Sequence, residues 1–208
     1  MNPHTSRIGC WAAILATGFG FAFSVAAFAQ VAGVLAAPWD TFWMVAPSIF
    51  LVWCYMILMA CILDAAPPDR KIWATIGLGF ALIYATMNSI VYMTVLAVVI
   101  PHVLQNQSAA VAVLLFEPGH FLIAVNGLAY GLMSISALFA APVFVRRGLE
   151  TRIRQAMVAH GVLAPIIVGA LAWPWLTYLG ALWMVTFPVM TILLATWFRT
   201  AKLDDHSQ

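Results

Sequence analysis

The stretch VRRGLETRIR, residues 145–154, holds four of the nine basic residues in a chain of 208 residues. Charged residues make up 8% of this chain and hydrophobic residues 64%, whereas soluble domains carry about 25% charged and roughly 45–50% apolar residues. So short a chain cannot bury that much apolar surface inside one water-facing globule. The composition predicts an integral membrane protein, with VRRGLETRIR in a loop between apolar spans.

Six apolar segments surround this loop. A spanning helix needs about 20 mostly apolar residues. The segments that reach this length are 8–35, 42–63, 72–100, 121–145, 153–173 and 176–198. Turn-forming sequences such as APWD and DAAPPDRK separate them, and the chain contains no internal repeat or linker. We therefore expect an all-α, polytopic transmembrane helical bundle with six spans, forming a single domain over residues 1–208.

The basic residues recur at every second connection between these spans. They are Arg7, Arg70, Lys71, Arg146, Arg147, Arg152, Arg154, Arg199 and Lys202. Cytoplasmic loops retain such cations because Lys and Arg resist translocation. The pattern predicts a multi-pass protein of the cell (inner) membrane with both termini in the cytoplasm. The cluster at 146–154 also suits anionic lipid or a membrane-protein partner, and a net charge of +2 without a basic stripe excludes nucleic acid.

The first span has a second interpretation as a signal peptide. It ends in AAFAQ, which offers an A-x-A cleavage site after Ala29. The apolar part of a signal peptide usually runs about 7–15 residues, and this one runs about 20, so we expect the segment to be retained. Cleavage would leave five spans and an amino terminus outside the cell.

The connection PHVLQNQSAAVAVLLFEPGH, residues 101–120, carries a candidate ligand set. Its apolar part, 109–116, is too short to span a bilayer, which favours an interfacial or re-entrant segment. His102, Glu117 and His120 would suit a metal ion or haem, because imidazole is a common ligand. No other cofactor is predicted, since the three cysteines are odd in number and form no CxxC pair.

Two stripes of polar residues follow the third and fourth spans at intervals of four residues, which places each stripe on one helix face. They consist of Tyr84, Asn88 and Tyr92, and of Asn126, Tyr130 and Ser134. Polar groups that face lipid lose their hydrogen-bond partners, so both stripes are expected to point into the bundle. They either hold the bundle together by interhelical hydrogen bonds or line a pocket for a small neutral ligand or a lipid headgroup.

No Asp, Glu, Lys or Arg lies in the middle of any span. This argues against an ion-coupled transporter and against a retinal protein. His160, inside the fifth span, is expected to be a buried histidine with its hydrogen bonds satisfied. The chain has no HExxH, Ser/His/Asp or paired-carboxylate arrangement.

These absences favour a non-enzymatic integral membrane protein, either an accessory subunit or a small-molecule or lipid-binding bundle. One alternative is a transporter or permease for a neutral solute, which needs a continuous polar path. The other is a membrane enzyme or cofactor binder that uses the outer His102, Glu117 and His120.

Three stretches resemble a group of small bacterial integral membrane proteins with six helices and no assigned function. They are GLAYGLMSISALFAAPVFVRRGLETRIR, GVLAPIIVGALAWPW and ALWMVTFPVMTILL. The resemblance implies a six-helix bundle over nearly the whole chain. It implies no activity and no functional residue.

Overall fold

The computed structural model describes residues 2–204, with side chains from residue 2 to residue 200. Within this range the chain forms helices and no strand. Five helical stretches are long and apolar enough to cross a membrane: Pro3–Val31, Trp39–Ala65, Pro68–Leu104, Phe121–Val143 and Leu176–Thr200. The prediction of an all-α protein is confirmed, and these five stretches support a membrane protein.

The first half of the chain forms three long helical stretches. These are α1 (Pro3–Val31), α2 (Trp39–Ala65) and α3 (Lys71–Thr94), with the short η1 (Pro68–Arg70) before α3. α3 continues through one π-helical turn, η2 (Val95–Val99), into α4 (Ile100–Leu104). The connection expected to be interfacial or re-entrant contains a 3-10 helix, η3 (Ser108–Leu114), which packs against η2 and α4.

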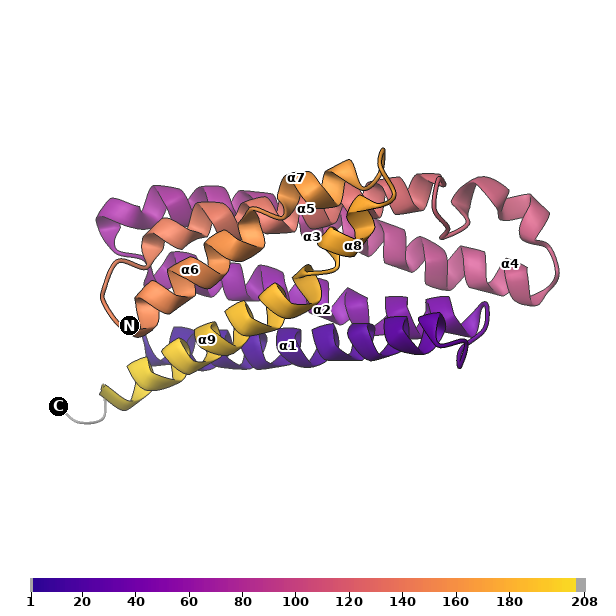
Figure 1. Ribbon diagram of the computed structural model, residues 1–208. Helices are drawn as coiled ribbons and strands as arrows, with labels where there is room; N and C mark the ends of the chain where they lie inside the picture. Colours follow the sequence, from indigo (N-terminus) through magenta and orange to yellow (C-terminus); the bar gives the residue numbers. More distant parts are fainter. Residues whose placement is uncertain (1, 205–208) are drawn as a thin grey trace.

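The second half returns along the first. It consists of α5 (Phe121–Ala140), η4 (Ala141–Val143), α6 (Leu149–Gly161), α7 (Ala164–Gly169), α8 (Leu176–Gly180) and α9 (Trp183–Asp204). α6 and α7 run back beside α5, and α9 then returns to the end of the bundle where α1 begins (Figure 1).

The helices pack side by side in a closed ring. Contacts link α1 to α2, α2 to α3, α3 to α5, α5 to α6, α6 to α9, and α9 back to α1. Two hydrogen bonds fasten the closing pair: the Thr17 and Thr191 hydroxyls lie 2.7 Å apart, and the Ser6 hydroxyl donates to the Phe198 carbonyl. Most of the largest fully buried side chains lie on these ring helices, among them Tyr55, Tyr84, Tyr92 and Phe187.

The fifth expected span, 153–173, is not one continuous helix. α6 has 13 residues and α7 has 6, and neither alone reaches the roughly 20 residues that a spanning helix needs. Pro165 explains the interruption, because proline has no N–H to donate to the carbonyl of Gly161 and its ring crowds that carbonyl. Leu163 instead bonds the carbonyl of His160 in a turn.

The first span lies slightly earlier in the chain than the expected 8–35. α1 starts at Pro3 because the Asn2 side chain accepts a hydrogen bond from the His4 N–H, and proline suits the first helical position. It ends before Gly33, whose φ of +70° favours glycine and closes the helix.

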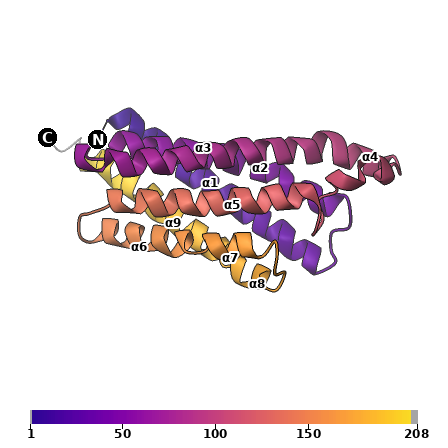
Figure 2. The ribbon, with the colours of Figure 1, turned by 90° about the horizontal axis from the view of Figure 1, so that it is seen from above.

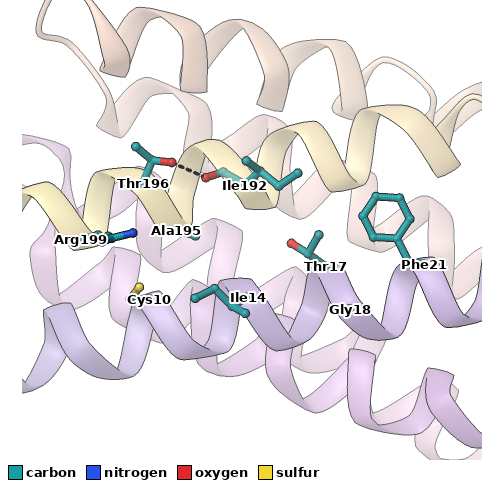
Figure 3. A pocket seen from close by; sticks show the side chains of 9 residues that line it. All are labelled: Cys10, Ile14, Thr17, Gly18, Phe21, Ile192, Ala195, Thr196 and Arg199. Carbon is teal, nitrogen blue, oxygen red and sulfur yellow. Dashed lines mark hydrogen bonds between the residues drawn. The ribbon is translucent and has the colours of Figure 1, made fainter.

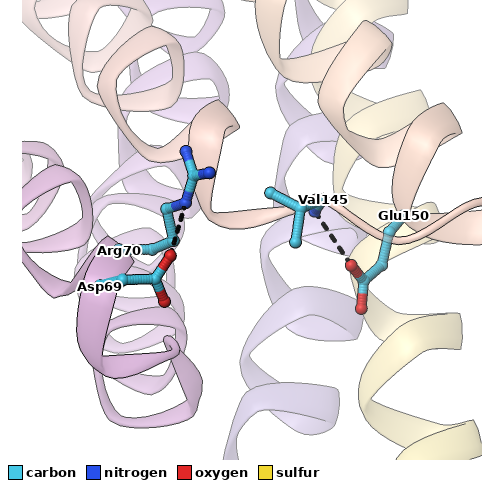
Figure 4. Close-up of polar contacts among 4 residues, drawn as sticks. All are labelled: Asp69, Arg70, Val145 and Glu150. Carbon is cyan, nitrogen blue, oxygen red and sulfur yellow. Dashed lines mark hydrogen bonds and ion pairs between the residues drawn. The ribbon is translucent and has the colours of Figure 1, made fainter.

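Within residues 2–200 the basic residues belong to η1, the first turns of α1, α3 and α6, the loop before α6 and the last turns of α9, and these segments meet at the end of the bundle where α1 begins (Figures 1 and 2). The side chain of Lys202 falls outside the described residues. At this end the Arg70 Nε lies 3.1 Å from the Asp69 carboxylate (Figure 4). Glu150 accepts hydrogen bonds from the N–H groups of Val145 and Arg146, at 3.1 and 2.8 Å, and so holds the cationic loop in a tight turn.

Glycine lets α5 and α6 approach each other closely. A Cβ atom at Gly161 would lie 2.6 Å from the Leu138 Cβ and 3.1 Å from the Ser134 backbone oxygen, distances that force a neighbour to move. Gly79, on the exposed face of α3, would meet nothing within 4 Å.

We expect Gly161→Ala to lower the free energy of unfolding by about 1–3 kcal/mol, the usual effect of inserting a methyl group into a packed contact. Gly79→Ala is the matched control and should raise stability by about 0.5–1 kcal/mol, because alanine favours a helix and meets no neighbour there. Thermal unfolding of both variants in detergent measures the difference. Equal melting temperatures would show that α5 and α6 do not approach as described.

Candidate functional site

The two predicted stripes meet between α3 and α5. The Asn126 amide nitrogen donates hydrogen bonds to the Asn88 side-chain oxygen and to the Tyr92 hydroxyl, both at 3.1 Å. The Tyr92 hydroxyl donates in turn to that of Tyr130, at 3.0 Å. Tyr84, Asn88, Tyr92, Tyr130 and Ser134 are buried, and Asn126 is half-buried. All six residues of the stripes therefore lie inside the bundle, as their spacing predicts.

Aromatic side chains from other helices complete this region. The ring of Tyr55, on α2, lies 5.8 Å from that of Tyr84 and 6.0 Å from that of Phe187, on α9 (centroid distances). The ring of Trp183, also on α9, lies 5.2 Å from that of Tyr130. Since Tyr84 contacts Tyr130 and Trp183 contacts Phe187, the five rings form a closed circuit of contacts across four helices.

The Tyr55 hydroxyl is tied to the α3–α5 contact. It donates to the Met133 carbonyl and to the Ser136 hydroxyl, both at 3.2 Å. Ser136 in turn donates to the Gly77 carbonyl on α3, at 2.7 Å. The sequence did not identify Tyr55 as a site residue. A single tyrosine in an apolar span forms no stripe at helical spacing, so its sequence neighbours do not predict which way it faces.

His160 brings α6 into the same region. It is fully buried, its Nδ1 lies 2.9 Å from the Thr186 hydroxyl of α9, and its ring packs against Phe187 at 5.8 Å between centroids. Its Nε2 has no hydrogen-bond partner. The expectation of a satisfied buried histidine therefore holds for one ring nitrogen and is wrong for the other. We refer to the six residues of the stripes together with His160 as the interior cluster.

Four buried polar atoms of the interior cluster have no partner: the Tyr84 hydroxyl, the Asn88 amide nitrogen, the Ser134 hydroxyl and the His160 Nε2. Most buried side-chain polar atoms in proteins form a hydrogen bond. Inside a membrane, a polar atom without a protein partner finds no water in the hydrocarbon to replace it. Asn88 Nδ2 can only donate, whereas the two hydroxyls can donate or accept. The arrangement therefore suits a small molecule that carries both acceptors and donors.

Two irregular helix segments lie beside the interior cluster. The π-helical turn η2 begins three residues after Tyr92, and the interruption between α6 and α7 begins two residues after His160. π-helical turns occur frequently at functional sites, and interrupted spanning helices form the binding sites of many transporters.

The predicted metal or haem ligands are not gathered in this way. His102 Nδ1 lies 2.8 Å from the Val98 carbonyl of its own helix, and Glu117 is exposed. The Nδ1 of His120, just before α5, is buried without a partner. Among the described residues no group of three or more His, Cys, Asp or Glu side chains is placed to hold a metal ion.

The chain matches no protein-family model, no curated protein and no solved structure with which it was compared. The resemblance to six-helix bacterial membrane proteins thus contributes no site residue. The candidate site consists of the interior cluster and the aromatic side chains around it.

The paired and unpaired members of the interior cluster should respond differently to substitution. Asn126→Leu removes two interhelical hydrogen bonds, and a typical one in a membrane protein is worth about 0.6 kcal/mol. We expect it to lower the melting temperature in detergent. Ser134→Ala removes a hydroxyl without a partner, so the melting temperature should stay the same or rise. Equal losses in the two variants would contradict the described hydrogen bonding.

Proposed function

We propose that this chain is a non-enzymatic integral membrane protein whose interior cluster binds a small, neutral molecule with hydrogen-bond acceptors and donors. The observation that carries the proposal is the set of four buried polar atoms without a partner. Tyr84 and Asn88 lie one turn apart on α3 and offer one pair of bonding groups. Ser134 and His160 offer a second pair, where α5 and α6 approach at Gly161.

The charge of the surroundings supports a neutral ligand. Among the described residues, the buried polar side chains comprise Ser, Thr, Asn and His, with no Asp, Glu, Lys or Arg. An ion bound among them would lack a compensating charge, and burying an unpaired charge is far more costly than burying a hydrogen-bonded neutral group. A molecule with hydroxyl, amide or carbonyl groups fits these partners.

The proposed topology has six spans, with α6 and α7 together as the fifth. Residues 149–169 would extend about 30 Å if helical throughout, which is the thickness of the hydrocarbon core. Both pieces pack against α5, which is a long apolar helix itself. The end that carries the basic side chains would face the cytoplasm, and both termini with it, in a cell membrane.

A permease for a neutral solute is the second candidate function. The interruption between α6 and α7 favours it, because broken helices at the bilayer midplane form the gated sites of many transporters. Uptake of the bound molecule into sealed proteoliposomes would favour this candidate over a binding protein.

The binding proposal can be tested on protein purified in mild detergent. We expect a solvent extract of the wild-type protein to contain a neutral small molecule, detected by mass spectrometry. Asn88→Leu and Ser134→Ala should reduce its amount, since each removes an unpartnered bonding group. Ser24→Ala is the control, because the Ser24 hydroxyl bonds the Gly20 carbonyl of its own helix, and α1 packs against α2 and α9, which hold no residue of the interior cluster. Equal amounts in all four proteins would refute the proposal.

The proposed topology predicts a pattern of cysteine labelling in intact cells. A cysteine at position 106 or 177 should react with a membrane-impermeant reagent from outside, and one at position 149 should not. Substituting the basic residues of 146–154 should weaken this orientation, since they hold nearly half of the cations that resist translocation. Outside labelling at position 149 would contradict the orientation.

A further inference from the structure

A second feature lies on the outer surface of the bundle, away from the interior cluster. α1 and α9 border a groove of about 390 Å³ (Figure 3). Ile14, Gly18 and Phe21 line it from α1, and Ile192, Ala195 and Arg199 line it from α9. Ile14, Phe21 and Ile192 are about half exposed, so the groove opens to the surroundings of the protein.

Small residues make the groove hollow. A Cβ atom at Gly18 would meet nothing within 4 Å, and Ala195 on the facing helix carries only a methyl group. A slender apolar chain can therefore approach both helices closely.

The hydroxyls along the groove are already paired. Thr17 donates to the Ala13 carbonyl and lies 2.7 Å from the Thr191 hydroxyl, while Thr196 donates to the Ile192 carbonyl. The length of the groove thus offers an apolar surface, and its polar character is concentrated at one end.

That end carries basic side chains from both helices. Arg199 lines the groove itself. Arg7 precedes Cys10, another lining residue, by three positions, which places both on the same face of α1. Both arginines are exposed, and within residues 2–200 neither forms a salt bridge. The groove therefore combines an apolar length with a cationic end, at the end of the bundle where the other cations lie.

We propose that this groove binds an anionic phospholipid of the surrounding bilayer, with an acyl chain along the α1–α9 contact and the phosphate group at Arg199 and Arg7. Guanidinium groups bind phosphate through paired, charge-assisted hydrogen bonds. Basic side chains at a membrane surface also attract anionic headgroups. The proposal goes beyond the function of the interior cluster and does not depend on it.

Charge argues against a second copy of the chain as the occupant. A twofold contact through this face would place the same surface on both copies. Arg7 and Arg199 of each copy would then lie near those of the other, and like charges repel. A phospholipid brings the opposite charge to the same place.

Native mass spectrometry of the detergent-purified protein tests the proposal. The probes are phosphatidylglycerol and phosphatidylcholine with identical acyl chains, titrated separately. We expect the wild-type protein to bind phosphatidylglycerol more tightly. Arg199→Gln should weaken phosphatidylglycerol binding roughly fivefold, the factor that corresponds to about 1 kcal/mol per basic residue. Gly18→Leu should weaken binding of both lipids, because its side chain fills the groove.

Two control variants match these changes elsewhere on the surface. Lys71→Gln removes an exposed cation from the start of α3, and Gly79→Leu adds the same side chain to another open position on a helix. Both should bind phosphatidylglycerol like the wild type. Equal binding by all variants, or equal affinity of the wild type for the two lipids, would overturn the proposal. So would disulfide crosslinking of Cys10 between two copies in native membranes, which would identify a second copy as the occupant.

Discussion

Hydrocarbon offers no hydrogen-bond partner, and this constraint decides which way each polar side chain of the protein points. Threonines on exposed helix faces satisfy their hydroxyls within their own helix: Thr86 and Thr94 each donate to the carbonyl four residues earlier. Amides and phenols cannot be satisfied so locally, and they turn toward neighbouring helices instead. The hydrogen bonds from Asn126 to Asn88 and to Tyr92, and from Tyr92 to Tyr130, are the result. The ring of helices therefore carries a cluster of polar groups within a largely apolar interior.

The helices and the two stripes could be predicted from the sequence because both depend on local regularity. High hydropathy over about 20 residues predicts a spanning helix, and polar residues that recur every four positions predict one polar face of that helix. Tyr55 and Phe187 belong to the site because α2 and α9 turn the faces that carry them toward it. Tertiary packing sets this orientation, and no local sequence pattern predicts it. The interruption before Pro165 could not be predicted either, because a proline within a span does not always end the helix: prolines 47 and 188 lie inside α2 and α9 without ending them. Before Pro165, in contrast, the chain makes a turn, and this turn lies beside the interior cluster.

α9 contributes to both of the features proposed here, from different faces. Its first turns carry Trp183 and Phe187 to the interior, and its later turns, from Ile192 to Arg199, face the outer groove. Thr191 lies between them and bonds α1. Contacts with α1 and α6 hold α9 in place between the interior cluster and the outer groove.

Closure of the ring by its last helix also determines how the protein is made. Thr17 and Thr191 are separated by 174 residues, and at a synthesis rate of about 5–20 residues per second the partner of α1 emerges roughly 10–35 seconds after it. During that interval the nascent chain is an open arc of helices in which α1 lacks one neighbour, and α6 lacks one from the time it emerges until α9 follows. The Ser6 and Thr17 hydroxyls of α1 lack their α9 partners until α9 is inserted, so the contact that closes the ring forms last.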